Sequence, residues 1–118
     1  MKLASFSLLL AAALAPTAAA ARAPLQPCSR LLRTYAHKAD LPAGARAVLF
    51  PMAERGGRFN VSDAISYEDR DLPFARFISA RQSGCVLNIR YEYGGIGHGF
   101  ATASLELRGG VWRLVRRR

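Results

Sequence analysis

The stretch CVLNIRYEYGGIGHGFATASLELRGGVWRLVR, residues 85–116, decides the fold because apolar and polar side chains alternate along it. Alternation with a period of two predicts β-strands that turn one face to a core. The apolar positions are Cys85, Leu87, Ile89, Tyr91 and Tyr93 in the first run, and Ala101, Ala103, Leu105 and Leu107 in the second. The pair Gly109-Gly110 supplies the positive φ of a tight turn into a third run, residues 111–116. The stretch therefore predicts an antiparallel meander.

The glycine-rich segment GGIGHG, residues 94–99, joins the first two strands of the meander. A dinucleotide-binding fingerprint needs Gly-x-Gly-x-x-Gly at the start of a helix, but here the third spacing is wrong and a strand follows. A phosphate-binding loop would end in Gly-Lys-Ser or Gly-Lys-Thr, which this segment lacks. We interpret it as a wide, bulged hairpin loop, and no cofactor is predicted.

The segment PCSRLLRTYAHKAD, residues 27–40, has apolar side chains at helical spacing. Spacings of three and four residues place these side chains on one stripe: Cys28, Leu31, Leu32, Tyr35, Ala36 and Ala39. Polar and charged residues, among them His37, occupy the opposite face. The pattern predicts an N-terminal amphipathic helix whose apolar stripe lies on the sheet.

Two further segments complete the predicted sheet. The pair Gly56-Gly57 predicts a hairpin between strands over residues 45–54 and 58–67, and residues 74–78 predict another strand. The fold class is therefore α+β, with one N-terminal helix packed on a strongly bent antiparallel sheet of four to six strands.

The first twenty residues have the order of a secretory signal peptide: Lys2, an apolar run, and small residues around Pro16. The apolar run is shorter than the roughly 20 residues that span a bilayer, so the mature chain has no predicted transmembrane segment. We expect cleavage near Ala20/Ala21, a single small α+β domain over residues 21–118, and a periplasmic or secreted protein. Lipid attachment at Cys28 is disfavoured, because a bulky amide and a proline precede it where small residues are needed.

Export would place the two cysteines, Cys28 and Cys85, in an oxidising compartment. Thiols that reach an oxidising compartment tend to pair, and these two are the only intramolecular option. Both lie on predicted apolar faces, one on the helix and one on the sheet. We therefore predict a disulfide that joins the two layers of the core.

The closing hairpin LRGGVWRL, residues 107–114, resembles the last hairpin of NTF2-like domains, which belong among the cystatin-like folds. The resemblance covers less than a tenth of the chain. It implies a cone-shaped sheet with a pocket, which some members use for ligands or catalysis and others for protein contacts. NTF2-like domains normally carry more helix before the sheet than this chain supplies, so a shorter cystatin-like arrangement fits better. No functional residue of the family carries over, since only the hairpin matches.

The chain is strongly basic. Its formal net charge is +9, and loss of Lys2 with the signal segment leaves +8. Most of the basic residues are arginines, including a C-terminal group of candidate anion-binding residues, Arg113, Arg116, Arg117 and Arg118. Such groups can hold an acidic partner by charge, or they can form a solubilising, frayed chain end. Nucleic acid is disfavoured, because export separates the protein from it and no aromatic-basic interleaving is present.

The candidates for chemistry are few. Tyr91, Tyr93 and His98 are candidate ligand-binding residues near the mouth of a pocket, and His98 is also the one candidate for a general base. It has no predicted partner, so no catalytic residue and no metal site is predicted. Residues 68–71 lack the spacing of a calcium loop, and Asn60 opens a formal glycosylation sequon.

The sequence favours a non-catalytic binding module for a protein partner or an anionic envelope component. The first alternative is a small-molecule-binding pocket protein of the cystatin-like or NTF2-like type. The second alternative is an enzyme that uses His98. A homodimer is an open possibility, since exposed sheet in folds of this shape often pairs.

Overall fold

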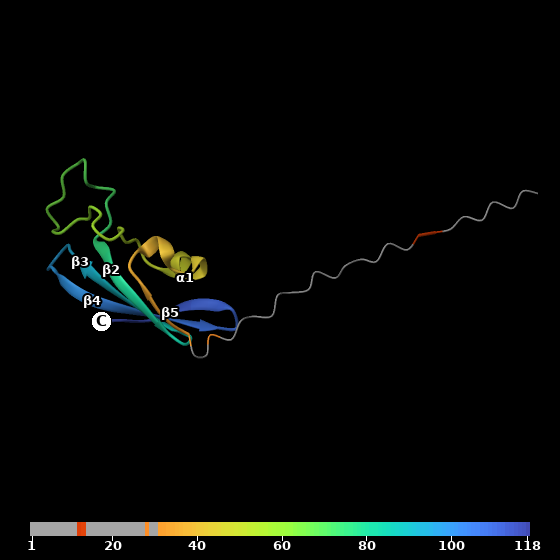
Figure 1. Ribbon diagram of the computed structural model, residues 1–118. Helices are drawn as coiled ribbons and strands as arrows, with labels where there is room; N and C mark the ends of the chain where they lie inside the picture. The colour runs from red at the N-terminus through yellow and green to blue at the C-terminus, as the bar shows by residue number, and fades with distance from the viewer. Residues whose placement is uncertain (1–11, 14–27, 29–30) are drawn as a thin grey trace, which may run out of the picture.

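The computed structural model describes residues 12–13, 28 and 31–118, and it contains a five-stranded antiparallel sheet in the order β1-β2-β3-β4-β5 (Figure 1). The strands are β1 (Leu32–Tyr35), β2 (Ala75–Ser83), β3 (Val86–Tyr93), β4 (Gly99–Arg108) and β5 (Val111–Arg117). One short helix, α1 (Ala43–Val48), and a 3₁₀ turn, η1 (Lys38–Asp40), lie between β1 and β2. Neighbours in the chain are neighbours in the sheet, so the topology is a meander.

The register confirms the meander that alternation predicted for the last third of the chain. Leu87 lies opposite Leu105 and Ile89 opposite Ala103, and all four side chains are buried on one face of the sheet. Gly109 and Gly110 have φ angles of 56° and 78°, as the tight turn between β4 and β5 requires. The strand predicted at residues 74–78 is also present, as the first half of β2.

The predicted N-terminal helix is wrong over the described part of residues 27–40. Leu32–Tyr35 is strand β1, whose Tyr35 lies opposite Ala80 of β2. The hydroxyl of Tyr35 donates to the buried Gln82 Oε1 at 2.9 Å, and the backbone N–H of Gly84 donates to the carbonyl of Leu31 at 2.7 Å. The helical spacing predicted that Leu31 and Leu32 would be buried on one stripe, but both side chains are exposed. Pairing with β2 decided the conformation, not the apolar stripe.

The predicted strands at residues 45–54 and 58–67 are also wrong. Gly56 does form a turn, with a φ angle of 73°, but the segments on either side are α1 and irregular chain. Among the described residues, their β-pairing with a strand is limited to a single bridge between Ala53 and Arg76. The buried residues Leu41, Ala45 and Met52 are too far apart in sequence to line one strand face, so this chain covers the sheet instead of extending it.

Glu54 stabilises the segment between β1 and β2, residues 36–74, which we call the covering chain. Its carboxylate accepts hydrogen bonds from the backbone N–H groups of Lys38, Ala39 and Arg55, at 2.7, 3.0 and 2.8 Å. Burial alone would raise the pKa of Glu54, but these three donors lower it below its usual value. In this segment, the charged carboxylate therefore accepts backbone hydrogen bonds of the kind that strand pairing would otherwise supply.

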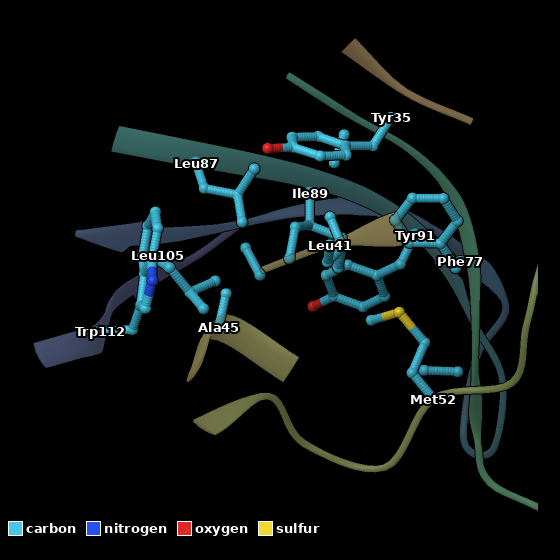
Figure 2. Close-up of a cluster of buried hydrophobic side chains, with 13 residues drawn as sticks. Tyr35, Leu41, Ala45, Met52, Phe77, Leu87, Ile89, Tyr91, Leu105 and Trp112 are labelled. Carbon is cyan, nitrogen blue, oxygen red and sulfur yellow. The ribbon is translucent and has the colours of Figure 1, made fainter. Parts of the chain in front are cut away.

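The core lies between one face of the sheet and the covering chain (Figure 2). Trp112 of β5, Leu105 of β4 and Ala45 of α1 pack at one end of the cluster, while Met52, Phe77 and Tyr91 lie at the other. A Cβ atom on Gly44 would lie 2.9 Å from Cδ1 of Trp112, so α1 approaches β5 as closely as glycine permits. A mostly-β α+β fold is confirmed, and its one short helix among the described residues, α1, lies mostly in a segment predicted as a strand.

The predicted disulfide between Cys28 and Cys85 is present. Cys28 does not belong to a helix, and Cys85 lies in the turn between β2 and β3, so the bridge joins the chain before β1 to that turn. No helix within the described residues is long and apolar enough to cross a membrane. The predicted signal peptide and its cleavage site lie outside the described residues, apart from residues 12–13.

Candidate functional site

A pocket of about 720 Å³ opens on the covered face of the sheet, next to the Tyr91 end of the core. The chain that follows α1 forms one wall, and the approach to β2 forms another. The ends of β3 and β5 complete it, and Figure 1 shows the C-terminus at the same end of the sheet as the start of β2. The pocket lining includes Phe50, Phe74, Tyr91, Tyr93, Ala101 and Arg117.

Four aromatic rings line the pocket, those of Phe50, Phe74, Tyr91 and Tyr93. The ring centroids of Phe50 and Tyr91 are 5.0 Å apart in an edge-to-face arrangement, and those of Tyr91 and Tyr93 are 6.5 Å apart. Tyr91 is 4% exposed, so its ring belongs both to the core and to the pocket lining. Phe74 and Tyr93 line the pocket and are partly exposed. The wall is therefore apolar, with phenol groups as its polar points.

One arginine is fixed at the edge of the aromatic wall. The guanidinium carbon of Arg117 lies 3.9 Å from the ring centroid of Phe50, a cation–π contact that orients the cation over the ring. Arg118 also lines the pocket. Asp71 is the carboxylate of the lining, and it lies 4.0 Å from the Nε atom of Arg70. The pocket lining thus contains the guanidinium of Arg117 and the carboxylate of Asp71, which lies near Arg70.

The C-terminal arginines do not all lie on the same face of the sheet. Arg117 lies opposite the buried Ala103 and shares the covered face with it. Arg113 lies opposite Glu106 and Arg116 opposite Ser104, on the other face of the sheet. The backbone of Arg118 exchanges hydrogen bonds with Thr102 at 2.6 and 2.9 Å. The alternative of a frayed chain end is therefore wrong, because these residues continue the sheet.

His98 lies apart from the two tyrosines with which it was grouped, since it does not line the pocket that Tyr91 and Tyr93 share. Its Nε2 atom lies 2.6 Å from Oε2 of Glu92, whose Oε1 accepts a hydrogen bond from Arg76 at 2.6 Å. The hydrogen bond with His98, followed by Arg76, lowers the pKa of Glu92 below its usual value, while burial opposes them.

His98 therefore has a partner that the sequence did not reveal. Its ring also lies 5.9 Å from that of Phe100, between centroids. Within the described residues, the side-chain hydrogen bonds of His98 reach Glu92 and no hydroxyl or thiol nucleophile. No group of three or more His, Cys, Asp or Glu side chains among those residues is placed to hold a metal ion. The contacts of His98 fasten the 94–99 loop to β3.

Asn60, the first residue of the sequon, forms hydrogen bonds within the fold. Asn60 is buried, and its Nδ2 atom donates to the carbonyls of Asp69 and Leu72 at 3.0 and 2.9 Å. Its backbone N–H donates to the carbonyl of Pro73 at 2.8 Å. Asn60 thereby fastens the loop that leads to Phe74 and the pocket wall. Residues 68–71 turn within this same loop.

Sequence reasoning found Tyr91 and Tyr93 but missed Phe50 and Phe74. The tyrosines belong to a strand whose alternation shows which way they face. Phe50 lies in irregular chain, where no period gives the direction of a side chain, and Phe74 precedes β2. The missed residues had no local signal beyond an aromatic ring next to a proline.

No protein-family model matches the chain, and neither a curated protein nor a solved structure matches it at the threshold of significance. The resemblance of residues 107–114 to NTF2-like domains therefore stays a prediction.

Proposed function

We propose that this chain is an exported, non-catalytic binding module whose pocket holds a ligand with an apolar body and an anionic end. The observation that carries the proposal is the joint presence of an aromatic wall and a fixed guanidinium at its edge. Phe50 belongs to both, because it packs on Tyr91 and lies under Arg117. An anionic amphiphile of the cell envelope has this combination of properties.

The apolar part of the ligand follows from the size and composition of the pocket. A volume of about 720 Å³ falls in the range of roughly 300–1,000 Å³ that is typical of small-molecule sites. Burying an apolar chain against Phe50, Phe74 and Tyr93 contributes about 25 cal/mol for each Å² removed from water. The hydroxyl of Tyr91 offers a hydrogen bond inside this otherwise apolar wall.

The guanidinium of Arg117 is the reason to expect an anionic group at one end of the ligand. The guanidinium carbon lies 3.9 Å from the ring centroid of Phe50, and guanidinium N–H groups at this edge can pair with a carboxylate or phosphate in the bidentate manner. The net charge, +9 for the full chain and +8 after loss of Lys2, attracts anions to the protein over longer distances. Asp71 lies at the same opening, so the anion is expected on the Arg117 side.

A protein partner is the second candidate, and the tip of the 94–99 loop favours it. Ile96 is 94% exposed there, between glycines with φ angles of 97° and 93°. A projecting aliphatic side chain of this kind is an anchor that an apolar cavity of another protein can bury. An enzyme that uses His98 would need a second reacting group within reach of the imidazole.

The test compares oleate with oleyl alcohol, which share a chain and differ in charge, by titration calorimetry with the oxidised protein. We expect oleate to bind at least tenfold more tightly. Ala101→Trp fills the pocket and should abolish binding of both, whereas Arg117→Gln should weaken oleate binding about tenfold and leave oleyl alcohol unchanged. Arg46→Gln removes an exposed charge on α1 and is the matched control.

Equal affinities for oleate and oleyl alcohol would contradict the anionic part of the proposal. Binding that survives Ala101→Trp would remove the ligand from this pocket altogether. If neither compound binds while the protein is folded, the amphiphile proposal fails and the protein partner becomes the leading candidate.

A further inference from the structure

The sheet face turned away from α1 carries arginines between short polar side chains. We call this surface the open face and define it by Arg81, Asn88, Arg90, Thr102, Ser104 and Arg116. The register places Arg81, Asn88, Ser104 and Arg116 side by side across β2 to β5, and Arg90 beside Thr102. Neighbouring strands lie about 4.8 Å apart, so the row from β2 to β5 is on the order of 14 Å long.

The arginines of the open face have no acidic partner within the described part of the chain. Arg81, Arg90 and Arg116 are exposed, and none of them forms an ion pair there. The carboxylates on the same face are already engaged, since Glu92 pairs with Arg76 and His98, and Glu106 pairs with Arg108. The open face is therefore a cationic surface whose charge complement must come from another molecule.

A hollow of about 270 Å³ lies at one end of this face, lined by Arg90, Phe100, Ala101, Thr102 and Arg118. The guanidinium carbon of Arg90 lies 5.9 Å from the centroid of the exposed Phe100 ring. The hollow thus combines an aromatic surface, guanidinium donors and a hydroxyl. A sugar acid presents the matching groups: an apolar ring face, a carboxylate and hydroxyls.

We propose that the open face binds a linear acidic polysaccharide, with one uronate unit in the hollow and further carboxylates on Arg81 and Arg116. The short side chains argue for a polymer over a membrane surface. Asn88 and Ser104 hydrogen-bond to each other at 2.6 Å on the floor between longer arginines. A flat headgroup layer would rest on the arginine ends, whereas a narrow polymer can lie between them and contact the floor.

The test is titration of the oxidised protein with polygalacturonate, and with neutral dextran of the same length. Arg81→Ala/Arg90→Ala removes two charges from the open face and should weaken polygalacturonate binding at least tenfold. Arg46→Ala/Arg55→Ala removes two exposed charges elsewhere and should change it less than twofold. Neither Arg81 nor Arg90 lines the amphiphile pocket, so this test and the oleate test fail independently.

Two further measurements separate a seated polymer from attraction by charge alone. Ser104→Leu fills the floor without changing the charge, and it should weaken polygalacturonate binding while vesicles of phosphatidylglycerol bind as before. Equal losses in the two double-arginine variants would overturn the proposal. So would unchanged binding in Ser104→Leu, or vesicle binding as tight as polymer binding and equally sensitive to Arg81→Ala/Arg90→Ala.

Discussion

The imidazole of His98 and the carboxylate of Glu92 are joined at 2.6 Å, and this contact fastens the glycine-rich loop to the end of β3. Arg76 holds the other carboxylate oxygen, also at 2.6 Å, so the charged form of Glu92 is stabilised from two sides. The side chain of Glu92 is only 13% exposed, which limits screening by solvent. The contact between His98 and Glu92 is therefore favoured by the charged form of the carboxyl group.

Folding stability should fall in acid because of Glu92. Its pKa is lowered in the folded protein relative to 4.5, so its contribution is present above that value and is lost as pH falls through the folded pKa. Urea unfolding at pH 7 and pH 3 should show a smaller acid loss for Glu92→Gln than for the native chain. Glu68→Gln, a change at an exposed carboxylate, is the control and should leave the acid loss unchanged. Equal acid losses in all three proteins would contradict the role of Glu92.

The disulfide should supply much of the stability. It closes a loop with a sequence separation of 57, which corresponds to about 4 kcal/mol in the chain-entropy treatment. A domain of this size has a total of roughly 5–15 kcal/mol, so Cys85→Ser should lower the melting temperature sharply. Cys28→Ser/Cys85→Ser should melt like the single variant, because either change opens the same loop. A melting curve that does not move would show that the bridge adds nothing.

Asn60 should matter as a hydrogen-bond donor within the fold. Asn60→Ala leaves the carbonyls of Asp69 and Leu72 without their donor, and we expect a loss of about 1–3 kcal/mol in urea unfolding. Ser62→Ala destroys the sequon without touching these bonds and should be close to neutral. Equal losses in the two variants would favour the glycosylation interpretation, because both changes remove the sequon.

The C-terminal half of the sheet could be predicted because its information is local. Alternation from Leu87 to Tyr91 shows which side chains are buried, and Gly109-Gly110 requires the turn that brings β5 beside β4. The pairing of Cys28 with Cys85 followed from their being the only two cysteines. Tyr91 and Tyr93 were placed on the correct face for the same reason as the rest of β3.

The tertiary structure alone decided β1 and the covering chain. Leu32–Tyr35 has the spacing of a helix, but pairing with β2 and the bond from Tyr35 to Gln82 favour a strand, and neither partner is near in sequence. Phe50, Phe74 and Arg117 come together in the pocket from three segments. A local period fixes the direction of a side chain only within a regular element, so contacts between distant segments, such as Arg117 over Phe50, depend on the assembled fold.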